Sequence, residues 1–121
     1  MEVRIGEATA DGTPYVVEIA GDIDIATVGD LEEPVVRAIE QGRRPVILDL
    51  SDCVFIDSSG IRLLLRAQHA LSENGVGTHQ LVVVARDHVA RLLRLVALDN
   101  VVPVVGSLAE AEGRLDLPTP A

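Results

Sequence analysis

A serine pair followed by a glycine offers the most distinctive chemistry in this 121-residue sequence. The residues are Asp57-Ser58-Ser59-Gly60, and they lie between an aliphatic segment that ends at Ile56 and a segment with helical spacing. The pattern predicts a serine hydroxyl in the first turn of a helix, where backbone N–H groups lack partners and an anion is stabilised. Such a hydroxyl suits either a helix cap or the acceptor of a phosphoryl group, and the spacing alone favours the cap.

Catalysis by these serines is not favoured. The sequence around them lacks the first glycine of a nucleophile elbow. The three histidines, His69, His79 and His88, do not have the spacing of a catalytic triad or a metal site. There is no glycine-rich phosphate loop, and no cluster of metal ligands surrounds Cys53. We therefore expect no enzyme activity, no catalytic residue, no metal and no cofactor.

Two elements must position the serines. An unbroken aliphatic segment at residues 46–50 predicts a central strand covered on both faces, joined to the serines by a short connection. A helix over residues 58–73 should follow, ended by Asn74-Gly75. The expected inward residues of this helix are Ile61, Leu64, Leu65 and Leu71, and the expected outward residues are Arg62, Arg66, His69 and Glu73.

Leu63 and Ala67 fall off the inward stripe of this helix. They either pack on a neighbouring helix or form an apolar contact patch for a partner, and the sequence favours neither reading. Arg62 and Arg66, spaced four residues apart, are typical of a solvated face, although they could also contact a partner.

The preceding part of the chain predicts a hairpin and a helix. Residues 3–8 and 15–20 read as paired strands, after which residues 21–24 should leave the sheet. Thr27, with Asp30 three residues later, resembles a helix cap followed by an acidic first turn. Pro34 predicts a kink in this helix, or a helix that begins near it.

The following part predicts two further strands and two further helices. Residues 81–85 form a buried strand, and Asp87 should cap a helix whose inward residues are Val89, Leu92, Leu93 and Val96. Pro103 favours an edge position for a strand at residues 101–105. Ser107 and Glu110 have the spacing of a capping box that opens a last helix.

This order predicts one α/β domain. We expect a mixed four- to five-stranded β-sheet with an N-terminal antiparallel hairpin and about four α-helices. The domain should span residues 1–115, and residues 116–121, with two prolines, should form a flexible C-terminal tail.

Charge and composition restrict the partners. The formal net charge of −9 argues against nucleic acid or an anionic membrane surface as a direct partner. The one cysteine cannot form an internal disulfide, which suits a reducing cytoplasm. No signal peptide is apparent, and no apolar run approaches the ~20 residues of a membrane helix. We therefore expect a cytoplasmic protein.

Four segments of the sequence resemble the STAS domain family, in particular the bacterial anti-sigma factor antagonists (anti-anti-sigma factors). They are residues 21–24 followed by Thr27, residues 46–61 with the Asp-Ser-Ser-Gly sequence, residues 81–84, and residues 95–111 with the Ser-x-x-Glu-Ala helix start. Asp-Ser-Ser-Gly between a strand and a helix is the most specific of these. The resemblance implies a STAS-like fold over nearly the whole chain.

The resemblance also implies a regulatory switch. Unphosphorylated, such a protein binds an anti-sigma factor, usually a serine kinase of the GHKL ATPase type, and so frees a sigma factor for transcription. The kinase phosphorylates the serine just before the glycine, which is Ser59 here, and binding weakens. A PP2C-type phosphatase resets the switch. The residues implied in partner binding are Asp24, Asp57, Ser58, Ser59, Gly60, Arg62 and Leu63.

Three further expectations concern these residues. Gly60 should leave space beside the hydroxyl, so that a kinase can approach closely. A phosphate on Ser59 should repel an acidic partner from a surface that already carries Asp22, Asp24 and Asp57. Arg62 occupies a position where some family members have a second small residue, so it could alter the choice of kinase.

The resemblance leaves other functions open. The chain could be a STAS subunit of a larger assembly, such as a stressosome-like scaffold or a lipid-transport complex, in which the fold has an architectural role. A third alternative is a STAS domain that binds a nucleotide or another small ligand.

Overall fold

The computed structural model describes residues 2–5, 15–40, 46–73 and 81–114. Strands and helices alternate after an initial pair of strands, as the sequence predicts. The strands are β1 (Glu2–Ile5), β2 (Tyr15–Ile23), β3 (Val46–Ile56), β4 (Leu81–Val84) and β5 (Val104–Val105). The helices are α1 (Val28–Glu40), α2 (Ser58–Glu73), α3 (Asp87–Leu95) and α4 (Leu108–Arg114), with a short 3₁₀ turn, η1 (Leu98–Asn100), before β5.

The five strands form one mixed sheet in the order β1-β2-β3-β4-β5. β1 is antiparallel to β2, and every other neighbouring pair is parallel. The predicted mixed sheet with an N-terminal antiparallel pair and four helices is confirmed. β5 occupies an edge, as Pro103 indicates. β1 includes residues 3–5 of the strand predicted at 3–8. Residues 6–8 and the expected tail at 116–121 lie outside the described residues.

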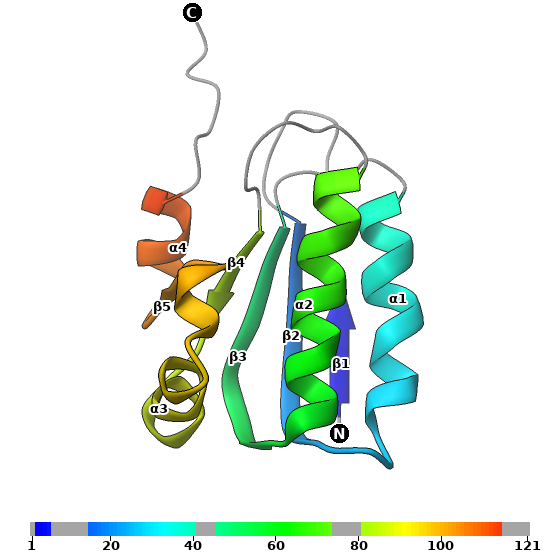
Figure 1. Cartoon of the computed structure of the whole chain (residues 1–121), viewed down its shortest axis with the longest axis horizontal. Helices are drawn as coiled ribbons and strands as arrows, with labels where there is room; N and C mark the ends of the chain where they lie inside the picture. The colour runs from blue at the N-terminus through cyan, green and yellow to red at the C-terminus, as the bar shows by residue number, and fades with distance from the viewer. Residues whose placement is uncertain (1, 6–14, 41–45, 74–80, 115–121) are drawn as a thin grey trace, which may run out of the picture.

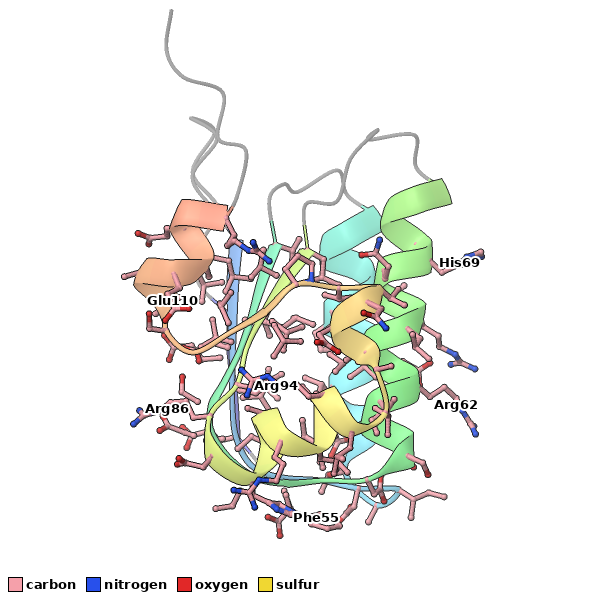
Figure 2. All side chains as sticks on the ribbon, turned by 60° about the vertical axis from the view of Figure 1, so that its left-hand side comes forward. Phe55, Arg62, His69, Arg86, Arg94 and Glu110 are labelled. Carbon is pink, nitrogen blue, oxygen red and sulfur yellow. The ribbon has the colours of Figure 1, made fainter. Side chains whose placement is uncertain are left out.

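Helices cover the sheet on two faces. α1 and α2 lie side by side over one face, and α4 lies on the opposite side (Figures 1 and 2). The larger core cluster includes Leu48 and Leu50 and lies on the side of α1, α2 and α3, whereas Ile47 belongs to a smaller cluster beside α4. β3 is therefore buried on both faces, which explains its unbroken aliphatic sequence.

β2 and β3 are both longer than the sequence predicts. Residues 21–23 remain in the sheet, and β3 continues beyond Leu50 to Ile56 without the expected connection. The pairing of β2 with β3 shifts register at two points, on either side of residues 20–21, and Gly21 has a φ of 97°. A glycine at such an irregularity adopts a backbone conformation that other residues avoid, so pairing resumes after it. As a result, β3 leads directly into the serines.

Several details of the helices also differ from expectation. α1 begins at Val28 and includes Pro34 as its seventh residue, so the helix does not begin at the proline. Asp87 is the first residue of α3 with a φ of 52°, and Arg86 occupies the cap position instead. Two residues predicted to face inward, Leu65 and Val96, are exposed. Helical spacing identified the helices correctly, but it assigned these two residues at the edge of the buried face to the wrong side.

Candidate functional site

The candidate site is the serine corner, residues 57–60, where β3 enters α2. Asp57 caps this helix: its Oδ1 accepts a hydrogen bond from the backbone N–H of Ser59 at 2.8 Å. The carbonyl oxygen of Asp57 also accepts bonds from the N–H groups of Gly60 and Ile61, both at 3.1 Å. These bonds satisfy donors that the helix start would otherwise leave unpaired. Asp57, rather than Ser58, is therefore the cap, and Ser58 is an exposed first residue of the helix.

The serine corner is tied to the end of β2. The N–H of Asp57 donates to the carbonyl oxygen of Ile23 at 3.1 Å, directly after the pairing of Ile23 with Ile56. The turn between β2 and α1 consequently lies beside the corner. The turn that contains Asp24 is therefore adjacent to the serine corner.

The carboxylate of Asp24 shapes that turn. Its Oδ1 accepts hydrogen bonds from the N–H groups of Ala26 at 2.9 Å and Thr27 at 3.1 Å. The hydroxyl of Thr27 completes the turn by donating to the carbonyl oxygen of Asp22 at 2.9 Å. Asp24 thus has the role of a turn aspartate while lying next to the site. The turn presents Ile25 to solvent, with 82% of its surface exposed.

Gly60 is required by packing beneath the corner. A Cβ atom on this residue would lie 2.5 Å from Cγ1 of Ile56 and 2.9 Å from Cγ2 of Ile23. The glycine is buried and lets the first turn of α2 rest on the ends of β2 and β3. The expectation that Gly60 leaves space for a kinase is therefore wrong, because the missing side chain would point into the core.

Ser59 borders a surface groove of about 220 Å³ between α1 and α2, here named the serine groove. The other residues that line the groove are Ile25, Val28, Glu32, Arg62, Leu63 and Arg66. Leu63 is only 3% exposed and belongs to the core, so the packing interpretation of this residue holds and its contact surface for a partner is small. Ala67 is buried in the same core cluster.

Two arginines border the serine groove. Arg66 forms an ion pair with Glu32 of α1. Arg62 lies one turn nearer to Ser59 and projects from the outer side of α2 (Figure 2). The surface around Ser59 is consequently of mixed charge, with Asp57 at the helix cap and cationic side chains along the groove. The expected aspartates of the corner thus lie beside cationic side chains on the groove side of the serine.

Exposed apolar side chains also lie on the segments that lead to the corner, the β2–α1 turn and the end of β3, and the sequence pattern assigns them no role. Ile25, Val54 and Phe55, here named the apolar rim, are 82%, 70% and 44% exposed. Phe55 lies at the end of the molecule where α2 begins (Figure 2). Large exposed apolar side chains gathered beside a polar site are typical of a protein-binding surface. In the sequence, Val54 and Phe55 are two apolar residues in a row within an apolar segment, so the pattern did not distinguish them from their buried neighbours Cys53 and Ile56.

Possible metal ligands in the described ranges include Cys53 and the acidic residues. Cys53 is buried, its Sγ donates to the carbonyl oxygen of Phe55 at 3.2 Å, and burial raises the pKa of the thiol. Within residues 2–5, 15–40, 46–73 and 81–114, no group of three or more His, Cys, Asp or Glu residues is arranged to hold a metal ion. None of the helices in these ranges has the length and apolar character to cross a membrane.

The described residues form a small α/β domain with a mixed five-stranded sheet, in which Asp57 caps α2 and Ser59 borders the serine groove. The chain belongs to the STAS domain family, whose family model matches residues 7–111. The sequence resemblance to this family is confirmed.

The chain is similar to several anti-sigma factor antagonists. It is 30% identical over 104 residues to the anti-sigma-B factor antagonist of Staphylococcus epidermidis, covering 86% of this chain and 94% of that protein. The crystal structure of an anti-sigma factor antagonist from Mycobacterium paratuberculosis matches with a TM-score of 0.79 and 25% identity, over 94% of this chain and 92% of the other. The fold also matches the phosphorylated form of the Bacillus cell fate determinant SpoIIAA, with a TM-score of 0.67, 22% identity, and coverage of 93% and 98%.

Proposed function

We propose that the protein is an anti-sigma factor antagonist that binds an anti-sigma factor when unphosphorylated and is released by phosphorylation at Ser59. The observation that carries the proposal is that different residues cap α2 and border the groove at its start. Asp57 caps the helix, so the hydroxyl of Ser59 is not needed for the cap, and Ser59 borders a surface groove. The names of the similar proteins supply the class of partner.

The chemical step is a phosphoryl transfer from ATP. The bond between the β,γ-bridging oxygen and the γ-phosphorus breaks, a bond from that phosphorus to Oγ of Ser59 forms, the hydroxyl proton passes to a base of the kinase, and ADP departs. The anti-sigma factor itself, as a serine kinase of the GHKL type, would supply the catalytic groups. A PP2C-type phosphatase would return the serine by hydrolysis. The protein is the substrate in both steps and contributes no catalytic residue.

The binding surface would centre on the serine corner. The apolar rim supplies buried area, and Arg62 supplies a charge at the edge of the same surface. Asp24, Asp57 and Ser58 border it through the β2–α1 turn and the helix cap. A phosphate adds about −1.5 to −2 charges and three oxygens in the middle of this surface. Binding would weaken through charge and bulk, without refolding of the domain.

The proposal can be tested with matched acidic substitutions. Ser59→Asp should abolish capture of the anti-sigma factor that the wild-type protein retains in a pull-down, whereas Ser59→Ala should bind constitutively. Ser107→Asp is the control, because it adds the same charge at the start of α4, and aspartate is also a good helix cap. Unchanged capture by Ser59→Asp, or equal loss with Ser107→Asp, would contradict the proposal.

The same pull-down separates the alternatives. Recovery of a transporter ATPase or of a multi-protein scaffold, with no kinase, would instead indicate a STAS subunit with an architectural role. Heat released on titration with ATP or GTP would indicate a nucleotide-binding domain. No contact among the described residues favours either alternative over the switch.

A further inference from the structure

The two arginines of the serine groove differ in their partners. Arg66 is held by Glu32 across the α1–α2 contact. Arg62 makes no ion pair with any of the residues that the structure describes, and its side chain is exposed. Arg62 is therefore a cation available to a new anion at the groove.

The helix brings this cation next to Ser59. Residues three apart on a helix share one face, with their Cβ atoms about 5–6 Å apart. Helical side chains also lean toward the N-terminus, which directs Arg62 over the turn that carries Ser59. Both side chains border the same groove, in agreement with this geometry.

We propose that Arg62 binds the phosphate of phosphorylated Ser59 within the same molecule. The guanidinium donates charge-assisted hydrogen bonds to the phosphate oxygens, a pairing that suits its planar shape. Phosphorylation then has two effects: it adds negative charge at the serine corner, and it withdraws Arg62 from any acidic group of the partner. The inference deepens the proposed function and rests on it for the modification of Ser59.

Arg62 competes with other charges around the phosphate. The charged side chains that border the serine groove or the corner are Asp24 from the β2–α1 turn, Glu32 from α1, Asp57 at the cap before α2, and Arg62 and Arg66 from α2. The acidic members are already engaged: Asp24 in its turn, Asp57 as the helix cap, and Glu32 with Arg66. Among these groups, Arg62 is the cation that can pair with the phosphate without breaking an existing contact.

The test is a ³¹P NMR titration of protein carrying phosphoserine at position 59, introduced during translation so that no kinase is needed. A nearby cation favours the dianion and so lowers the second pKa of the phosphate, which is ordinarily about 6. Arg62→Gln should raise this pKa by about 0.2 to 0.4 unit relative to the wild-type chain at low salt. Arg66→Gln, at the same groove but one turn further along, should change it by less than half as much.

Two results would overturn the inference. The second pKa could be the same with and without Arg62, or Arg66→Gln could raise it as much as Arg62→Gln, which would indicate general surface charge and not a contact. Either result leaves the proposed function intact. Conversely, if phosphoserine 59 does not weaken partner binding, the proposed function fails while a pKa raised by Arg62→Gln still supports the phosphate contact.

Discussion

The starts of α2 and α4 both carry a serine, and the two serines are used differently. At α4, Ser107 is the cap: its Oγ accepts a hydrogen bond from the N–H of Glu110 at 3.1 Å. At α2, Asp57 is the cap: its Oδ1 accepts a hydrogen bond from the N–H of Ser59. Ser59 itself is the second residue of the helix. The hydroxyl of Ser107 therefore stabilises its own helix, whereas that of Ser59 remains available for chemistry.

The charged residues near the two serines also differ, with a carboxylate beside Ser107 and a guanidinium beside Ser59. Ser107 has the carboxylate of Glu110 nearby, which accepts a hydrogen bond from the N–H of Gly106 at 3.4 Å. Phosphorylation of Ser107 would disturb the cap of α4 and place the phosphate beside the carboxylate of Glu110, which repels it. A phosphate on Ser59 would meet Arg62 and an intact cap. The comparison shows that the side chain that caps a helix start differs between α2 and α4, and that in α2 the cap leaves the Ser59 hydroxyl out of that bond.

The largest expected effect on stability comes from the glycines of the two helices. Gly60→Ala should lower the free energy of unfolding by about 1–3 kcal/mol, because the added Cβ overlaps Ile56 and Ile23. Gly113→Ala in α4 meets no atom within 4 Å and should raise it by up to about 1 kcal/mol. Urea unfolding monitored by circular dichroism measures both. Equal effects of the two substitutions would refute the packing role of Gly60.

The next effect is the loss of the cap of α2. Asp57→Ala should cost about 0.5–2 kcal/mol of unfolding free energy, because the N–H of Ser59 loses its acceptor. Asp57→Asn should retain most of that stability, since asparagine caps equally well. If Asp57→Ala leaves the denaturation midpoint unchanged, Asp57 is not the cap and the contrast with α4 disappears.

The smallest effect is the exchange of each serine for alanine. Ser107→Ala should cost about 0.5–1 kcal/mol, measured as increased fraying or hydrogen exchange of α4. Ser59→Ala should change stability by less than about 0.5 kcal/mol, because its hydroxyl does not cap α2. A larger loss for Ser59→Ala than for Ser107→Ala would reverse the assignment of the two hydroxyls.

Local patterns in the sequence predicted much of this arrangement. The bounds of α2, the capping pair at Ser107 and Glu110, and the edge position of Pro103 each follow from residues close together in the chain. The order of strands and helices likewise follows from alternating aliphatic and amphipathic segments. The family and the fold could therefore be predicted from sequence.

Contacts between distant segments account for what the sequence could not predict. β2 and β3 extend past their expected ends because they pair with each other around the irregularity at Gly21. Gly60 is constrained by Ile23, a residue far away in the sequence. The ion pair of Arg66 with Glu32 joins two helices. Periodicity within one segment contains no information on such contacts.

The most direct test of the central claim is to locate the phosphoryl group. The protein is incubated with ATP and the anti-sigma kinase that it captures, and the modified residue is identified by mass spectrometry. We predict modification of Ser59, none of Ser58 or Ser107, and no labelling of Ser59→Ala. Modification of Ser107 or Ser58, or undiminished labelling of Ser59→Ala, would contradict the account.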